Sequence, residues 1–257
     1  MLMNLVAKLE LVTYIYKINT EWIPMTLKNI FILIFLLGNF TNNYSQNEVF
    51  TINELIGKTT PKNSNNNYKL RKEVYDSFLL MQKAALKDGI KIKIVSAYRS
   101  YNRQQNIWNR KFKQFKSNGM STEDAVNKIL EYSTIPGTSR HHWGTDIDII
   151  METKTPVSKL LLTSNYNVNG PFNKLKKWMD KNAKDYCFEL VYTNDPKRTG
   201  FNYEPWHYTF YPTSEKILKA FISKKAISYI DLQKIEGNKI LTLDKLHNYL
   251  KNNIIIK

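Results

Sequence analysis

The stretch SRHHWGTDIDII, residues 139–150, constrains the fold of this chain more than any other segment. Residues 145–150 alternate polar and apolar side chains with the period of two that is typical of a β-strand. On such a strand Asp146 and Asp148 point to the same face. Two adjacent histidines and Gly144 come before it, and a glycine permits a sharp chain reversal. We therefore expect a strand that begins beside a cluster of histidine and aspartate side chains.

The remaining patterns predict helices and strands in irregular order. Apolar residues recur at helical spacing from Leu70 to Leu86, and Gly89 ends that pattern. Further helices are expected at about 102–115, from Ser121, at about 172–184 and after Pro212, and further strands at 92–95, 188–192 and 206–211. Because helices and strands do not alternate strictly, we expect an α+β fold rather than a doubly wound sheet. In this fold a small central antiparallel sheet is flanked by helices.

The N-terminal region resembles a secretory signal peptide at residues 25–46. A lysine precedes an apolar run from Ile30 to Leu37, which is too short to span a membrane comfortably, and a polar exit follows. The alternative is a buried or amphipathic helix. The signal-peptide interpretation makes residues 1–24 an upstream extension and predicts an exported protein that is periplasmic or extracellular and associated with the cell wall, with no stable membrane span after cleavage near Ser45 or Gln46. N-terminal sequencing of the secreted protein tests it.

The amino-acid composition excludes several kinds of site and partner. One cysteine, Cys187, excludes an internal disulfide and a cysteine-rich zinc site. The formal net charge is +16, but the lysines are spread along the chain and no nucleic-acid motif accompanies them, so we expect no nucleic-acid partner. The charge fits work near anionic polymers such as a cell wall, and equally well a solvated lysine-rich surface.

Few residues in the chain have the chemistry of a metal site. A catalytic zinc takes three protein ligands and keeps one position open. His141 and Asp148 supply two candidates, and the third must come from the remaining histidines, of which His247 lies in a polar C-terminal helix where we expect it to be solvated. His207 stands in the aromatic segment EPWHYTF, where a histidine needs a partner. Taken alone, this histidine is a hydrogen-bonded core residue and the 139–150 stretch a polar turn; together they predict a His, Asp, His set.

Two further residues suggest catalysis. Glu204 precedes His207 by three residues, and a carboxylate beside a metal can take a proton from activated water. Arg99 follows the strand at 92–95, where an arginine can grip a carboxylate in a bidentate manner. For a lone arginine, an ordinary surface position is the simpler interpretation.

Three blocks together resemble the zinc D-alanyl-D-alanine carboxypeptidases of the VanY type, relatives of the D-Ala-D-Ala dipeptidases and of the hedgehog fold. SAYRSYNRQ (96–104) resembles the family's S-x-Y-R-S-x-x-x-Q block, SRHHWGTDID (139–148) its S-x-H-x-x-G-x-A-x-D motif, and EPWH (204–207) its E-x-W-H motif. The order of the blocks agrees with the family as well. The resemblance implies a peptidase domain at 47–212, whose sheet carries the zinc site, and leaves 213–257 as a C-terminal helical extension.

The resemblance also implies a role for each matching residue. It makes His141, Asp148 and His207 the zinc ligands and Glu204 the catalytic base. Arg99 matches the catalytic arginine that holds the terminal carboxylate of the substrate, and the other positions implied to bind substrate are Gln104, Ser139 and Trp206. Asp146 replaces the usual alanine, as a group behind a ligand or as an alternative ligand. His142 falls at a variable position, where we expect it at the edge of the pocket or facing solvent.

The implied activity is a zinc-dependent D,D-carboxypeptidase that acts, as a monomer, on peptidoglycan stem peptides. The rival enzymes are a dipeptidase, an L,D-carboxypeptidase and an endopeptidase, which would use the same ligands and base. A rival of another class is a non-catalytic zinc-binding module, against which the presence of both Glu204 and Arg99 argues. A serine or cysteine hydrolase is disfavoured because the chain has no G-x-S-x-G and Cys187 has no nearby histidine in sequence.

Overall fold

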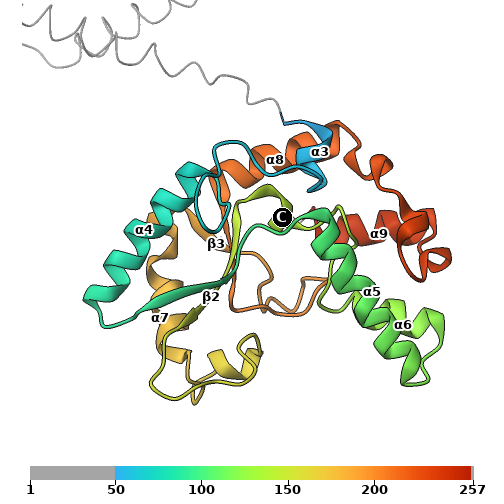
Figure 1. Cartoon of the computed structure of the whole chain (residues 1–257). Helices are drawn as coiled ribbons and strands as arrows, with labels where there is room; N and C mark the ends of the chain where they lie inside the picture. The colour runs from blue at the N-terminus through green and yellow to red at the C-terminus, as the bar shows by residue number, and fades with distance from the viewer. Residues whose placement is uncertain (1–49, 256–257) are drawn as a thin grey trace, which may run out of the picture. The chain divides into compact units, whose positions relative to one another are not determined.

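The computed structural model describes residues 50–255, and its centre is a four-stranded antiparallel sheet (Figure 1). The strands are β1 (Ile92–Ser96), β2 (Asp146–Met151), β3 (Phe188–Leu190) and β4 (His207–Phe210), in the order β1-β2-β4-β3. Helices surround this sheet, which confirms the expected α+β class. The predicted upstream extension and signal peptide lie outside the described residues.

Strand β2 is central, and its pairing with β4 decides which side chains share a face. Asp148 lies opposite His207, and Asp146 lies opposite Thr209. Directly paired residues of antiparallel strands point to the same side, so these four polar side chains gather on one face. Ile147 and Ile149 point to the other face, into an apolar cluster. The alternation seen in the sequence therefore separates the site from the core.

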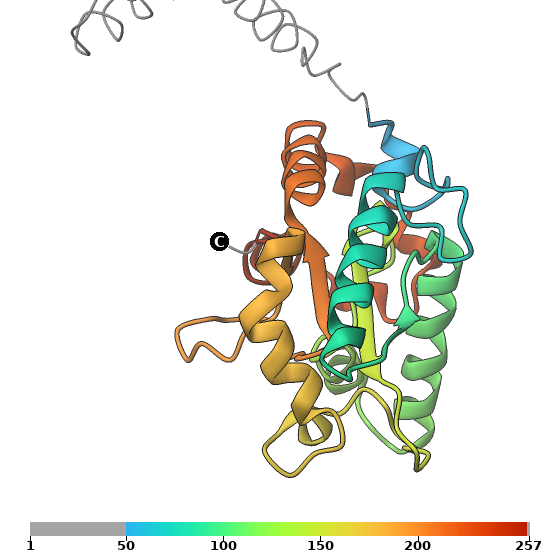
Figure 2. The same cartoon turned by 90° about the vertical axis from the view of Figure 1, so that its left-hand side faces the viewer.

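Two helices cover the apolar face of the sheet, as Figure 2 shows: α4 (Lys72–Lys87) and α7 (Asn173–Asn182). Helix α4 buries Val74, Phe78 and Met81 at helical spacing against the sheet. It ends where Gly89 adopts the left-handed conformation with φ of 69°, as the stop after Leu86 predicts. Helix α7 ends at Asn182 and continues as the short 3₁₀ helix η3 (Ala183–Tyr186).

The other side of the sheet belongs to a second apolar cluster. The helices α5 (Tyr101–Ser117) and α6 (Thr122–Ile129) contribute to it from the middle of the chain, and α8 (Tyr211–Ser223) and α9 (Leu243–Asn253) from its end. Ser100 and Ser121 cap α5 and α6 by accepting backbone N–H bonds. The segment after Pro212 is thus helical, as expected, and its apolar residues pack with Trp108 and Trp143.

Several boundaries differ from the sequence prediction. Strand β3 ends at Leu190, so Val191 and Tyr192 lie beyond it, and Tyr211 begins α8 instead of ending β4. The short helix α3 (Ile52–Leu55) was not predicted; its Glu54 forms a buried ion pair with Arg71. The other short elements are the 3₁₀ helices η1 (Arg140–Trp143), η2 (Thr163–Tyr166), η4 (Ala226–Tyr229), η5 (Leu232–Lys234) and η6 (Asn238–Ile240). Among residues 50–255, none of the helices combines the length and apolar character of a membrane span.

Candidate active site

A cavity of about 450 Å³ opens over the polar face of β2 and β4. Its wall includes side chains from three separate parts of the sequence, which the sheet brings together. Lining residues predicted from the sequence are Arg99, Ser139, His141, Asp148, Glu204, Trp206 and His207. Other lining residues include Ile107, Lys111, Tyr132, Ser133, Leu161, Leu162 and Tyr192. Eleven of the eighteen residues of the wall lie outside the predicted set; Ile107 and Lys111 come from helix α5, and most of the others come from segments between the three motifs.

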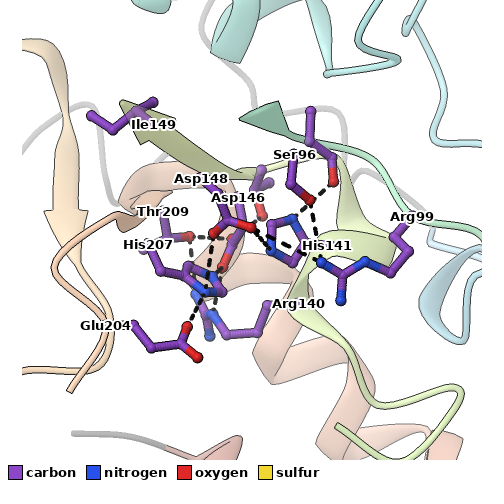
Figure 3. Close-up of polar contacts among 12 residues, drawn as sticks. Ser96, Arg99, Arg140, His141, Asp146, Asp148, Ile149, Glu204, His207 and Thr209 are labelled. Carbon is purple, nitrogen blue, oxygen red and sulfur yellow. Dashed lines mark hydrogen bonds and ion pairs between the residues drawn. The ribbon is translucent and has the colours of Figure 1, made fainter. Parts of the chain in front are cut away.

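The expected metal ligands form one buried cluster, which Figure 3 shows. One ligand atom from each of His141, Asp148 and His207 can be chosen so that all lie within 4.8 Å of one another. His141 Nε2 is 3.4 Å from Asp148 Oδ2, and His207 Nδ1 is 3.6 Å from Asp148 Oδ1. The cluster results from the turn at Gly144, where φ is 68°, and from the β2–β4 register. The chain reversal predicted at Gly144 is therefore confirmed.

The donor set fits a metal ion by its chemistry. His141 donates from Nδ1 to the carbonyl oxygen of Ala97 at 2.8 Å, which leaves the lone pair of Nε2 for the cluster. Asp148 Oδ1 is buried and has no hydrogen-bond partner among the described residues. A buried carboxylate oxygen without a partner is costly. Two imidazole nitrogens and this oxygen provide the three protein ligands of a catalytic zinc site.

His207 lies among three carboxylates, those of Asp146, Asp148 and Glu204. Burial lowers its pKa, but the hydrogen bonds to Asp146 and Glu204 outweigh burial and raise the pKa to about 10. This environment strongly favours a positive charge at the cluster, which either a proton or a metal ion supplies.

Asp146 supports His207 from behind instead of joining the cluster. Its Oδ2 accepts hydrogen bonds from His207 Nε2 at 2.8 Å and from Arg140 Nε at 3.0 Å. Its Oδ1 accepts from the hydroxyls of Thr145 at 2.8 Å and Thr209 at 2.6 Å. Burial raises the pKa of Asp146, but Arg140 and His207 outweigh it and hold the pKa below its ordinary value. Of the two roles considered for this residue, the geometry gives it the supporting one.

Glu204 stands beside the cluster, at the end of the segment that leads into β4. Its Oε2 is 3.1 Å from His207 Nδ1. Burial raises its pKa, although His207 pulls in the opposite direction. A carboxylate whose pKa is raised is a better proton acceptor, which is what a general base requires.

Arg99 approaches the cluster from the end of β1 and is mostly buried, with 18% of its side chain exposed. Its Nη1 donates to Gln104 Oε1 at 2.8 Å and its Nη2 to Ser96 Oγ at 3.2 Å. Nη2 is also 4.0 Å from Asp148 Oδ2, so the guanidinium faces the ligand cluster. Burial lowers the pKa of Arg99, and Asp148 opposes this effect. Because its side chain is mostly buried, Arg99 is not an ordinary surface arginine.

The other sequence candidates have different surroundings. Ser139 and Trp206 line the cavity. Gln104 is fully buried and does not line it; it connects Arg99 to the loop by donating from Nε2 to the carbonyl oxygen of Thr134 at 2.8 Å. Gln104 therefore lies where it can orient Arg99.

The expectation for His142 is wrong, because this residue is completely buried. It accepts a hydrogen bond from the backbone N–H of Gly137 at 3.1 Å and donates from Nδ1 to the carbonyl oxygen of Arg99 at 2.5 Å. Burial lowers its pKa to about 3, so the imidazole is neutral. A Cβ on Gly57 would come within 2.4 Å of this ring, which shows how closely the chain surrounds it.

Sequence reasoning missed several residues that hold the site together. Arg140 and Thr209 bind Asp146, and Ser96 binds Arg99. The ring of Tyr192 packs edge-on against His207, with 4.9 Å between the centroids. Arg140 and Thr209 carried a weak signal, since each neighbours a predicted ligand or strand position; the approach of Tyr192 depends on a loop and carried none.

This chain is similar in sequence to one protein family model and to individual known proteins. A family model described as "VanY: D-alanyl-D-alanine carboxypeptidase" matches residues 67–213. A D-alanyl-D-alanine carboxypeptidase of Enterococcus faecalis is 28% identical over 128 residues, which cover 49% of this chain and 42% of that protein. The protein YodJ of Bacillus subtilis is 30% identical over 141 residues, covering 54% and 45%. The chain thus spans less than half the length of these two relatives.

Two solved structures are similar at lower identity. One is VanYB in complex with D-alanine-D-alanine, with 23% identity, a TM-score of 0.47, and coverage of 62% of this chain and 81% of that one. The other is a mutant of the vancomycin resistance D,D-pentapeptidase VanY in complex with Zn(II), with 24% identity, a TM-score of 0.46, and coverage of 67% and 84%.

Proposed function

The chain belongs to the VanY family of D-alanyl-D-alanine carboxypeptidases, and on this premise we propose that it is a zinc peptidase that removes the terminal D-alanine from peptidoglycan stem peptides. One observation carries the proposal: the buried cluster of His141, Asp148 and His207 has Glu204 3.1 Å from one of its members. The cluster lies in a cavity that Arg99 also lines. A purely structural metal site needs neither an adjacent carboxylate nor a cation.

His141, Asp148 and His207 would hold the zinc ion through Nε2, a carboxylate oxygen and Nδ1. When bound, zinc supplies Lewis-acid chemistry, which polarises a carbonyl group and lowers the pKa of water to about 7. Asp146 accepts a hydrogen bond from the Nε2–H of His207 and thereby keeps Nδ1 turned toward the cluster.

Glu204 is the proton carrier in this proposal. Its carboxylate takes a proton from the attacking water and delivers it to the amine of the leaving D-alanine. The raised pKa of the carboxyl group suits both transfers, because the group must first bind the proton and then release it.

Arg99 would hold the terminal carboxylate, so that only a chain end is positioned for cleavage. Its guanidinium is already fixed by Gln104 and Ser96, which reduces the entropy lost when substrate binds. Ser139 and Trp206 line the same cavity. Stem peptides lie outside the cytoplasmic membrane, so the proposal agrees with the export expected from residues 25–46.

The test is incubation of the zinc-loaded protein with muropeptides and analysis of the products by mass. We expect pentapeptides to lose one alanine. Loss of a dipeptide would indicate a dipeptidase, and loss of alanine from tetrapeptides only would indicate an L,D-carboxypeptidase. Internal cleavage would indicate an endopeptidase. Each of these products would contradict the D,D-carboxypeptidase proposal. Absence of every product would favour a non-catalytic zinc-binding module.

The role of Glu204 has its own test in the isosteric substitution Glu204→Gln. The amide cannot accept the proton, so turnover should fall about 10²–10⁴-fold. The bound zinc, measured by elemental analysis, should stay at the wild-type level because the three ligands are intact. Activity close to wild type in this variant would show that another group is the base.

A further inference from the structure

One face of helix α5 connects the proposed carboxylate site with the outer part of the cavity. Gln104, Ile107 and Lys111 are spaced i, i+3 and i+7, so they lie on the same side of the helix. Gln104 binds Arg99, while Ile107 and Lys111 line the cavity. With a rise of about 1.5 Å per residue, the Lys111 backbone is about 10 Å further along the helix axis than Gln104.

Lys111 is a third basic side chain in this cavity, beside Arg99 and Arg140, the latter being paired with Asp146, and much of Lys111 is buried. Its Nζ donates to Ser133 Oγ at 2.6 Å. An ammonium group has three donors, so this hydrogen bond uses only one of them. Between residues 50 and 255, no aspartate or glutamate oxygen forms an ion pair with Lys111.

The surroundings of Lys111 are unfavourable for a cation that has no counterion. Burial lowers its pKa; Glu204 opposes this effect, whereas Arg110 and Arg99 add to it. Ile107, four residues before Lys111 on α5, and Tyr132, next to Ser133, line the same wall. A partly desolvated ammonium binds an anion more strongly than a surface lysine does.

Arg99 does not fill this role, because its two terminal nitrogens are directed to Gln104 and Ser96 beside the metal cluster. We propose that Lys111 and Ser133 form a second anion subsite, which binds a carboxylate of the substrate other than the one held by Arg99. The inference rests on the proposed peptidase function and adds a substrate class to it. The favoured substrates are peptides with an acidic side chain on the residue that precedes the two terminal D-alanines.

The test uses three synthetic peptides and two measurements. The peptides are acyl-Glu-D-Ala-D-Ala, acyl-Gln-D-Ala-D-Ala and a C-terminal carboxamide of the glutamine peptide. Turnover by the zinc-loaded enzyme gives kcat and KM separately, and calorimetry with the Glu204→Gln variant gives binding without cleavage. The substitutions are Lys111→Met, Lys111→Arg and the matched control Lys113→Met, which removes a lysine with a 74% exposed side chain from the same helix.

We expect the glutamate peptide to bind about 10-fold more tightly than the glutamine peptide, as one charge-assisted hydrogen bond allows. The difference should lie in KM, disappear in Lys111→Met, persist largely in Lys111→Arg and be unaffected by Lys113→Met.

Two results would overturn the subsite. One is an equal affinity of the wild type for the glutamate and glutamine peptides. The other is a Lys111→Met variant that weakens binding of the glutamine peptide but not of its carboxamide, which would make Lys111 the ligand of the chain end. If no peptide is cleaved while calorimetry still shows the Lys111-dependent preference, the proposed peptidase function fails and the anion subsite stands.

Discussion

At the scale of single residues, aspartate stands at position 146, where the family resemblance leads us to expect alanine. The carboxylate is fully buried, and its oxygens accept hydrogen bonds from Arg140, His207 and two threonines. A buried anion is tolerated only with such partners. Asp146 and Arg140 therefore form a buried ion pair in which each charge compensates the other.

We predict that Asp146→Asn weakens zinc binding about 10–100-fold, the usual effect of losing a group that supports a ligand. The amide keeps an acceptor for His207 but loses the charge that opposes Arg140. Competition with a chromophoric chelator measures the affinity.

The paired variant Asp146→Ala/Arg140→Leu serves as a control, because it removes the buried cation as well. If the zinc affinities of Asp146→Asn and of the paired variant both equal that of the wild type, Asp146 does not orient His207.

Individual site residues were predictable to the extent that they stand in short motifs. The ligand cluster came from His141, Asp148 and His207, whose spacing on a turn and two strands follows from local sequence. The burial of His142 was not predictable, since it depends on Gly57 and Gly137, which approach from separate loops. Neighbouring residues in a 3₁₀ turn point in different directions, and only the surrounding chain determines which one enters the core.

At the scale of elements, helix α9 supports the loop that carries Ser139. The phenolic oxygen of Tyr249 accepts the backbone N–H of Ile135 at 3.2 Å and shares a hydrogen bond of 2.6 Å with Thr138 Oγ1. Both contacts are buried and lie just before η1. The C-terminal helices therefore support one wall of the active site.

We predict that Tyr249→Phe lowers the free energy of unfolding by about 1–3 kcal/mol, because buried polar groups lose their partner. Urea denaturation measures this change. The matched substitution Tyr229→Phe, at a residue that is 56% exposed, should have little effect. Equal stability of the two variants would show that the contact of α9 with the loop contributes nothing.

Helices and strands were predictable where the apolar period is strong, as in α4 and β2. The partnership between α9 and the 133–139 loop was not, because it joins segments more than a hundred residues apart. The exposed residues of α9 include Asp244, His247, Asn248 and Lys251, and its apolar residues alone do not identify what they pack against.

At the scale of the whole molecule, the ligand cluster links segments that are far apart in sequence. Zinc that binds the folded protein but not the unfolded chain stabilises the fold, by about 2.7 kcal/mol when its free concentration is 100 times Kd. We predict that chelation by EDTA lowers Tm and that added zinc restores it.

The variant His141→Ala provides the control for this measurement, because it lacks one ligand and its Tm should respond little to zinc. A wild-type Tm that is insensitive to both chelator and zinc would contradict the assignment of the cluster as a metal site.

The pairing of β2 with β4 has a consequence for how the chain folds. On the polar face of the sheet, Asp148 lies opposite His207. Tyr208, which follows His207 on β4, points to the other face and into its apolar cluster. A slip of β4 by one position would exchange these two side chains, placing an imidazole among apolar groups and removing one ligand. Such a misaligned chain would offer two of the three ligands and would bind the metal ion more weakly. Metal binding thus stabilises the correct register of the sheet relative to the slipped one.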